Sequence, residues 1–164
     1  MPDNVRGSLP PLPKIRKDVL RVNTAESHTF IILSASIWGQ YVHWYGNRSH
    51  ECTQEKLKQC NGCERSWPVK WKGYLHVRNI TNSWSGFLEI TETAYRLIDH
   101  QLGTEKNLRG VKIKISRTKG GAKGRYQVEV FESRVDSDLL ERELDPYDTL
   151  KFLWSCKRPA GQQS

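Results

Sequence analysis

Hydrophobic and polar residues alternate along much of the chain, which is the pattern of β-strands that bury one face. The alternation predicts five strands, at residues 29–33, 37–45, 71–80, 87–91 and 111–116. Tyr126, Val128 and Val130 predict a further strand, which would pair with 111–116 as a hairpin across a glycine-rich turn. The chain is therefore expected to be mainly β.

Helical spacing of apolar residues occurs in the middle of the chain, over residues 92–102. Thr91 is suited to cap the start of this helix, and Gly103 to end it. Nearer the C-terminus an acidic helix is expected at 136–144, followed by a second helix at about 145–154. Short strands around one mid-chain helix predict a small barrel like the oligonucleotide-binding (OB) fold.

These elements divide the 164 residues into three expected parts. Residues 1–17 form a proline-rich basic arm, 18–134 an OB-like domain with an insertion at 43–70, and 135–164 a helical segment and tail. No apolar run approaches the roughly 20 residues that cross a bilayer. Because the N-terminal residues also lack the apolar region of a secretory signal, we expect a cytoplasmic protein.

The insertion holds three cysteines, which in a reducing compartment suit metal ligands better than disulfides. Cys60 and Cys63 form a Cys-x-x-Cys pair that can present two thiolates to one tetrahedral ion, and Cys52 adds a third. His50 is the nearest candidate for the fourth ligand, with His43 as the alternative. Four protein ligands predict a structural Zn²⁺ ion. The competing interpretation is a redox or incidental cysteine pair without metal.

The strand after the insertion combines rings and cations on one face, the combination that grips single-stranded nucleic acid. That face carries Lys72, Tyr74, His76 and Arg78. Two more rings near this strand are candidates for base stacking, Trp67 and Trp84. The core is expected to take up three other rings, Trp38, Trp44 and Trp71.

Charge is distributed unevenly around a net value of +8. The region 104–125 is strongly basic, and such a segregated field attracts polyanions. Its candidate phosphate contacts are Arg109, Lys112, Lys114, Arg117, Lys119, Lys123 and Arg125. The balance inverts at 132–148, an acidic stretch suited to docking replication, recombination or transposition proteins.

At these residues the chain resembles the zinc-containing single-stranded-DNA-binding proteins of T-even phages and their bacterial relatives. The resemblance rests on the order of His50 or His43, Cys52 and the Cys60–Cys63 pair, followed by the 71–78 strand. It implies an OB barrel with an inserted zinc subdomain that binds unpaired strands without sequence preference.

The favoured function is therefore binding of single-stranded nucleic acid, DNA before RNA, in replication, recombination or repair. A zinc-stabilised adaptor in a nucleic-acid-processing complex and an RNA-binding protein are the alternatives. Catalysis is not expected, because a zinc deaminase needs His-x-Glu and Pro-Cys-x-x-Cys. Here Glu51 follows His50 directly, and Gln59 stands where the proline belongs.

Overall fold

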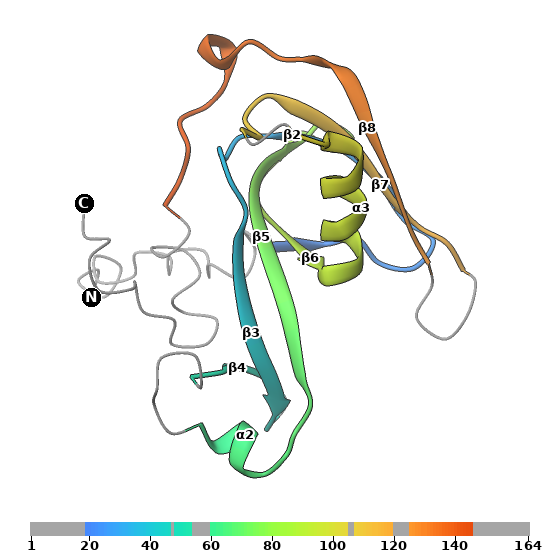
Figure 1. Ribbon diagram of the computed structural model, residues 1–164. Coiled ribbons are helices and arrows are strands. Elements are labelled where there is room, and N and C mark those ends of the chain that lie inside the picture. The colour runs from blue at the N-terminus through green and yellow to red at the C-terminus, as the bar shows by residue number, and fades with distance from the viewer. Residues whose placement is uncertain (1–18, 47, 54–59, 105–106, 120–124, 146–164) are drawn as a thin grey trace, which may run out of the picture.

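The computed structural model describes residues 19–46, 48–53, 60–104, 107–119 and 125–145, and this part of the chain is mainly β, as predicted (Figure 1). Its strands are β1 Val19–Arg21, β2 Ser27–Ile32, β3 Trp38–Tyr45, β4 Arg48–Glu51, β5 Val69–Asn79, β6 Trp84–Thr91, β7 Val111–Arg117 and β8 Tyr126–Arg134. The helical elements are α2 Asn61–Glu64, α3 Glu92–Leu102 and the 3₁₀ turn η3 Ser137–Leu139. None of the helices described is long and apolar enough to span a membrane.

The strands form one mixed sheet in the order β1-β6-β5-β2-β7-β8. The long strand β5 pairs along one side with both β2 and β3, and along the other side with β6. All these pairs are antiparallel except β1 with β6. Among the described residues β1 and β8 do not pair, so the sheet is open and these strands do not close the predicted barrel.

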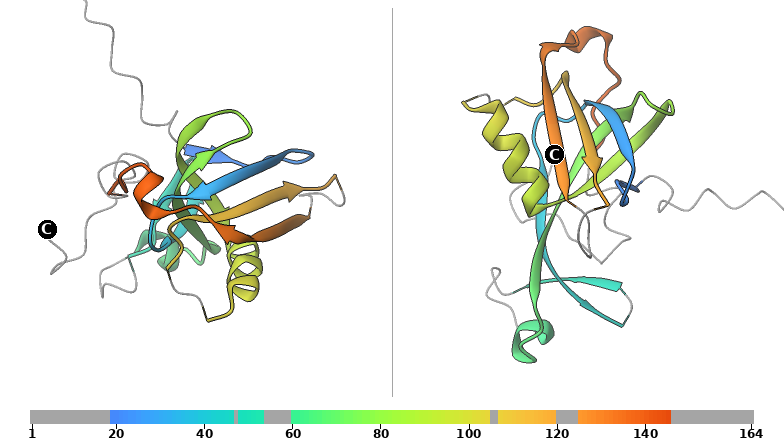
Figure 2. Two further views of the ribbon diagram at one scale, coloured as in Figure 1. Left: turned by 90° about the horizontal axis from the view of Figure 1, so that it is seen from above. Right: turned by 90° about the vertical axis from the view of Figure 1, so that its right-hand side faces the viewer.

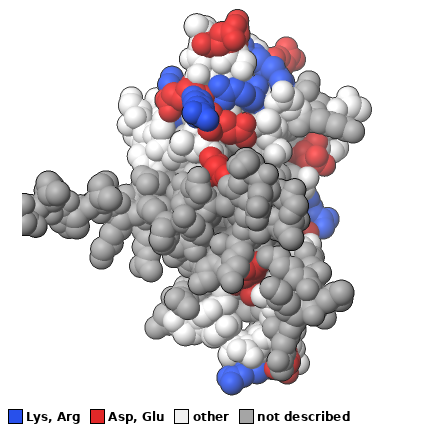
Figure 3. All heavy atoms as spheres, turned by 90° about the vertical axis from the view of Figure 1, so that its left-hand side faces the viewer, with Lys and Arg blue, Asp and Glu red and all other residues white. Residues whose placement is uncertain are grey.

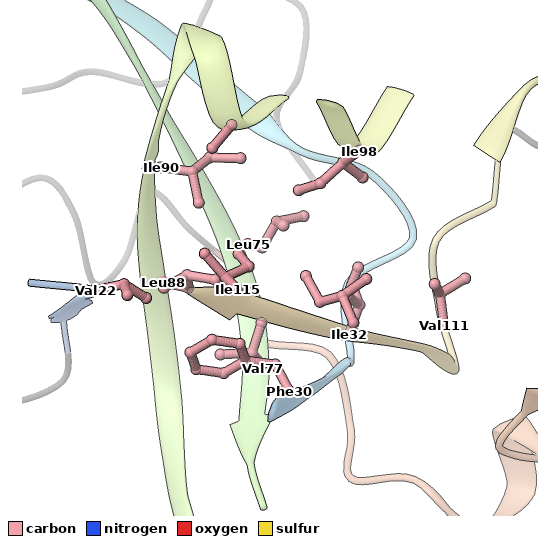
Figure 4. Close-up of a cluster of buried hydrophobic side chains, with 12 residues drawn as sticks. Val22, Phe30, Ile32, Leu75, Val77, Leu88, Ile90, Ile98, Val111 and Ile115 are labelled. Atoms are coloured by element: carbon pink, nitrogen blue, oxygen red, sulfur yellow. The ribbon is translucent and has the colours of Figure 1, made fainter. Parts of the chain in front are cut away.

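The main hydrophobic core lies between the curved sheet and α3 (Figure 4). It is built from the alternating apolar residues of the central strands, including Phe30, Ile32, Leu75, Val77, Ile113 and Ile115. The α3 helix spans the predicted residues because its ends are defined locally. The Thr91 hydroxyl accepts a hydrogen bond from the Ala94 amide at 3.3 Å, and Gly103 ends the helix at φ +63°.

The zinc insertion predicted from the sequence is a hairpin of β3 and β4 followed by α2, and it projects from the end of the sheet (Figures 1 and 2). The sequence pattern predicted none of β1, β4 and α2. A further small core of Val42, Tyr74 and Phe87 lies on the opposite face of β5 from the main core. Both faces of β5 are therefore buried over much of its length.

The acidic helix predicted at 136–144 is wrong, because only η3 is helical there. The segment instead crosses the body of the protein, where its backbone finds other partners. The Arg109 guanidinium donates to the Glu141 carbonyl at 2.7 Å, and the Leu144 amide donates to Nδ1 of His76 at 3.2 Å. These tertiary bonds replace the helical ones. The predicted 1–17 arm and the helix expected after Asp145 lie outside the described residues.

Candidate metal centre and cationic cleft

One histidine and three cysteines meet where the β3–β4 hairpin packs against α2. They are His43, Cys52, Cys60 and Cys63, and one ligand atom from each lies within 4.8 Å of all the others. The sulfurs of Cys52 and Cys63 are 3.6 Å apart, and those of Cys52 and Cys60 are 4.0 Å apart. A Cys₃His donor set of this size fits one tetrahedral metal ion with no open position.

Backbone carbonyl groups orient the ring of His43 toward the cysteines. Its Nδ1 lies 3.2 Å from the backbone carbonyl oxygens of both Trp67 and Pro68. Nδ1 must therefore carry the ring proton and donate it, which leaves the Nε2 lone pair for a metal. Nε2 lies 3.4 Å from the Cys63 sulfur. A backbone carbonyl bound to the far nitrogen is the usual support of a metal-binding histidine.

His50, the sequence's first choice as fourth ligand, lies outside the cluster. Its ring stacks on that of Tyr45, with centroids 3.5 Å apart and planes 5° apart. Its Nε2 donates to the Tyr45 carbonyl at 3.0 Å. His50 was favoured because it is the histidine nearest to Cys52 in the sequence. In the structure the turn after Cys60 packs against β3, and it is His43 that its residues contact.

Gly62, between Cys60 and Cys63, is required by the histidine rather than by the turn. A Cβ at this position would lie 2.3 Å from Cγ of His43, far inside van der Waals contact. The ring of His43 thus packs directly on the Gly62 backbone. A side chain here would have to displace the ring from the cysteines.

The thiols of the cluster differ in pKa. Burial raises the pKa of Cys60, but hydrogen bonds from the backbone amides of Cys63 and Thr53 and from the neighbouring thiols outweigh it and lower the pKa to about 6. Burial, hydrogen bonds and the charges of Cys52 and Cys60 raise the pKa of Cys63 to about 12. Crowded thiolates repel one another, and a divalent cation relieves that repulsion by displacing the remaining protons.

Beside the metal cluster, a cleft of about 440 Å³ runs between the β3–β5 strands, the start of α3 and the β7–β8 hairpin. Its rings are Tyr41, Trp71 and Tyr126. Its basic side chains are Arg21, Lys70, Lys72 and Arg117, against the two carboxylates of Glu89 and Glu92. We call this the cationic cleft. It brings aromatic and basic side chains from distant parts of the sequence to one surface.

Trp71 is held at the cleft by two facing glycines. Gly39 and Gly73 are partners across β3 and β5, and a Cβ on either would lie about 2.5 Å or less from the Trp71 indole. The indole therefore packs directly against both backbones, and it also contacts the ring of Tyr95 at a centroid distance of 5.1 Å. Trp71 was predicted to be a core residue, and it does pack against the main core while remaining partly exposed.

Glu89 lies at the floor of the cationic cleft with only 9% of its side chain exposed. It accepts hydrogen bonds from Nε of Arg21 at 2.8 Å and from the hydroxyl of Tyr74 at 2.7 Å, and Lys72 Nζ lies 3.3 Å away. Burial raises the pKa of this carboxyl, but Lys72, Arg21 and the Tyr74 hydroxyl outweigh burial and lower it. The group is therefore an ionised carboxylate at neutral pH.

Two residues predicted to contact nucleic acid are buried. Tyr74 and His76 are each 1% exposed, although alternation placed them on an outer face. The prediction is wrong because β5 is a central strand with both faces covered, so that its second face meets Phe87 rather than solvent. Trp44 shows the opposite error, since it was assigned to the core and is 62% exposed.

Two predicted phosphate contacts, Arg78 and Arg109, bind the acidic segment instead. Nε of Arg78 donates to the Glu141 carboxylate at 2.7 Å, and Arg109 donates to backbone carbonyls of the same segment. On the face of the protein shown in Figure 3, basic and acidic side chains lie against one another near the top. These arginines therefore hold the acidic segment against the rest of the protein. The carboxylates of Glu141 and Glu143, although exposed, accept further hydrogen bonds from Ser85 and from the Ala35 amide.

The remaining predicted contacts lie on the β7–β8 hairpin or in ring clusters. Lys114, Lys119 and Arg125 are exposed, whereas Lys112 lies over the ring of Phe131 and Arg117 over that of Tyr126. Lys123 lies outside the described residues.

Trp67 and Trp84, the two predicted stacking rings, are both partly buried. Trp67 packs between Tyr45 and Arg65. Trp84 packs against the main core.

Sequence reasoning missed four residues of the cationic cleft: Arg21, Tyr41, Lys70 and Tyr126. The alternation of β3 did place Tyr41 opposite Trp44, and that was the one available signal. Arg21 and Tyr126 reach the cleft through strand pairing, β1 with β6 and β8 with β7. No known protein family, curated protein or solved structure matches this chain, so its function has to be argued from this surface and the metal cluster.

Proposed function

We propose that this protein binds single-stranded nucleic acid, DNA before RNA, in the cationic cleft and without sequence preference. The observation that carries the proposal is that one cleft combines three aromatic rings with four basic side chains. A structural Zn²⁺ ion at His43, Cys52, Cys60 and Cys63 would hold the hairpin that forms one wall. Rings stack on unpaired bases of any identity, and cations follow the phosphate backbone.

The order of strand pairing supports this proposal. If β1 and β4 are set aside and β2 and β3 are taken together as one bent strand, the remaining strands and α3 follow the OB order of three strands, a helix and two strands, with β2 also pairing with β7. OB folds bind oligonucleotides on strands two and three, between the loops that follow strands one and four. Here those parts are β5, β6, the β3–β4 hairpin with the metal cluster (the metal hairpin) and the β7–β8 turn, and residues on or beside them line the cleft.

Binding to oligonucleotides in solution tests the proposal. Quenching of tryptophan fluorescence by oligo-dT, with a matched duplex and a matched RNA in parallel, should show preference for the single strands. If the four cations each neutralise one phosphate, log affinity against log salt should have a slope of about −3, since each contact on a single strand contributes roughly −0.7.

Tyr41→Ala is the sharpest variant for this test, because its ring is 41% exposed and lines the cleft. Loss of one stacked ring should weaken binding by about 1–3 kcal/mol. Ser133→Ala, an exposed residue of β8 that does not line the cleft, is the matched control. Equal affinity for duplex and single strand, or an affinity that salt does not change, would refute the proposal.

A further inference from the structure

We propose that Arg21 and Lys72 together form a binding site for one backbone phosphodiester at the floor of the cationic cleft, and that Glu89 positions both cations for it. The inference rests on the proposed function and names the phosphate contact within it. Nothing in the sequence pattern singled out Arg21 or Glu89. They come together because β1 adds in parallel to the edge of β6.

Three strands converge on the Glu89 carboxylate. In the sheet register Arg21 of β1 lies beside Glu89 of β6, and Tyr74 of β5 lies on its other side. Both carboxylate oxygens bind Arg21, at 2.8 Å and 3.2 Å, so the guanidinium is fixed in its plane as well as in position. Lys72, two residues from Tyr74 along β5, reaches the same carboxylate at 3.3 Å.

The two cations keep hydrogen-bond donors for a ligand. Glu89 binds Nε and Nη2 of Arg21, and the guanidinium has five N–H donors in all. Lys72 uses two contacts, to Glu89 and to the Ser49 hydroxyl at 3.2 Å, and an ammonium has three donors. In the described part of the chain no further partner of these two side chains is found, and both line the cleft.

Exposure within this group increases from the carboxylate to the cations. The side chain of Glu89 is 9% exposed, that of Lys72 20% and that of Arg21 62%. The carboxylate is thus the most buried of the three groups, which together carry one net positive charge. An anion entering the cleft would meet oriented donors and would not have to order two long side chains itself.

The neighbouring rings indicate which kind of anion Arg21 and Lys72 would bind. Trp71 and Tyr41 border the same cleft on the β3–β5 side, and Tyr126 borders it on the β7–β8 side. Rings and cations that line one cleft suit the bases and phosphates of a nucleic acid strand. A free phosphate ion would use the cations alone, so the two sources can be told apart by the contribution of the rings.

Glu89 has two opposing effects on binding, and they predict opposite results. Its charge weakens the attraction for phosphate, whereas its hydrogen bonds hold Arg21, which stands on a three-residue edge strand. Because a carboxylate anchors Arg21 through both oxygens, we expect the loss of positioning to exceed the gain in charge. Glu89 is therefore a positioning residue, which acts through Arg21 and Lys72.

The test measures binding of oligo-dT to the full-length, metal-loaded chain with Glu89→Gln. Affinity should fall about tenfold and the salt slope should become shallower. Lys72→Gln should weaken binding in the parent protein but have little effect in the Glu89→Gln background. Asp138→Asn, on the exposed η3 turn, removes the same charge far from the cleft and is the control for net charge.

Higher affinity or a steeper slope in Glu89→Gln would overturn the proposal, and so would an undiminished effect of Lys72→Gln in that background. If Glu89→Gln does not fold, Tyr74→Phe removes one hydrogen bond from the carboxylate and should weaken binding two- to threefold, while an unchanged affinity would refute positioning. Inorganic phosphate that competes as well as oligo-dT would contradict the phosphodiester assignment. If the parent protein binds no single-stranded nucleic acid, the proposed function itself is refuted.

Discussion

The ring of His43 is constrained on three sides, so it is the member of the candidate metal cluster with the most fixed orientation. Two carbonyl oxygens fix Nδ1, the backbone of Gly62 packs on the ring face, and Nε2 meets the Cys63 sulfur. A histidine fixed in this way offers one nitrogen in one direction, which lowers the entropy lost when a metal binds.

His43→Asn should remove metal from the protein, whereas His50→Asn should not. Loss of a supporting contact already weakens metal binding by about 10–100-fold, so loss of the ligand itself should exceed that range. Zinc content after purification and the reactivity of Cys52, Cys60 and Cys63 toward a thiol reagent measure both effects. Retention of one equivalent of metal by His43→Asn would assign the fourth ligand elsewhere.

Gly62→Ala should destabilise the metal hairpin by about 1–3 kcal/mol, the usual cost of overpacking. The added methyl group would overlap the His43 ring and force it away from the sulfurs. Asn61→Ala is the matched control, because Asn61 is exposed in the same short helix and its loss should cost no more than about 0.5 kcal/mol. Thermal unfolding of the metal-loaded variants compares the two.

At the scale of secondary structure, elements with local signals could be predicted and elements made by tertiary contacts could not. The α3 helix carries its own cap and stop residues, so its bounds were predicted correctly. Strand β4 and helix α2 contain polar residues with no alternation, and their shape depends on the hairpin and on the four ligands. The acidic segment has helical spacing, yet hydrogen bonds to Arg109 and Ala35 hold it extended.

The acidic segment should loosen at mildly acidic pH because His76 helps to hold it. The Leu144 amide donates to Nδ1 of His76 at 3.2 Å, so this bond requires the neutral ring. Burial, the largest influence, lowers the pKa of His76 and Arg109 lowers it further, whereas the facing carboxylates of Glu141 and Glu143 raise it, with a net decrease.

Since the folded pKa of His76 lies below its unfolded value, the stability that the neutral ring contributes is complete above the unfolded pKa and falls as pH drops below it. Amide hydrogen exchange of the 140–145 segment, corrected for the intrinsic effect of pH, should therefore quicken between pH 7 and 5. Exchange in β7, where Ile113 and Ile115 are fully buried, should not change over that interval and provides the internal control. Equal protection of 140–145 at both pH values would contradict this role of His76.

At the scale of the whole molecule, the sheet creates a surface that no stretch of sequence contains. The cationic cleft draws on β1, β3, β5, β6, β7 and β8. Composition and the basic 104–125 region predicted an anion-binding protein, and Lys72 and Arg117 were both named from sequence. The cleft could not be located, however, because packing on both faces of β5 buries Tyr74 and His76, and strand pairing brings Arg21 and Tyr126 to the cleft.

The metal hairpin and the cationic cleft share strands, so removal of metal should disable the cleft before it unfolds the core. The amide of ligand Cys52 donates to the carbonyl of Tyr41 at 2.8 Å, and ligand His43 pairs with Val69, next to Lys70. The main core and α3 have no ligand of the cluster among their residues. Because only the hairpin depends on the ligands, the two parts should respond separately.

Chelation should therefore speed hydrogen exchange across β3 and β4, lower the affinity for oligo-dT at least about tenfold, and leave α3 and β7 protected. Zinc added back should restore both properties, and Cys52→Ser should reproduce the chelated state. Cooperative loss of protection in β7 together with β3 would mean that the ion supports the whole fold. Undiminished affinity without metal would instead mean that nucleic acid binding does not depend on the metal hairpin.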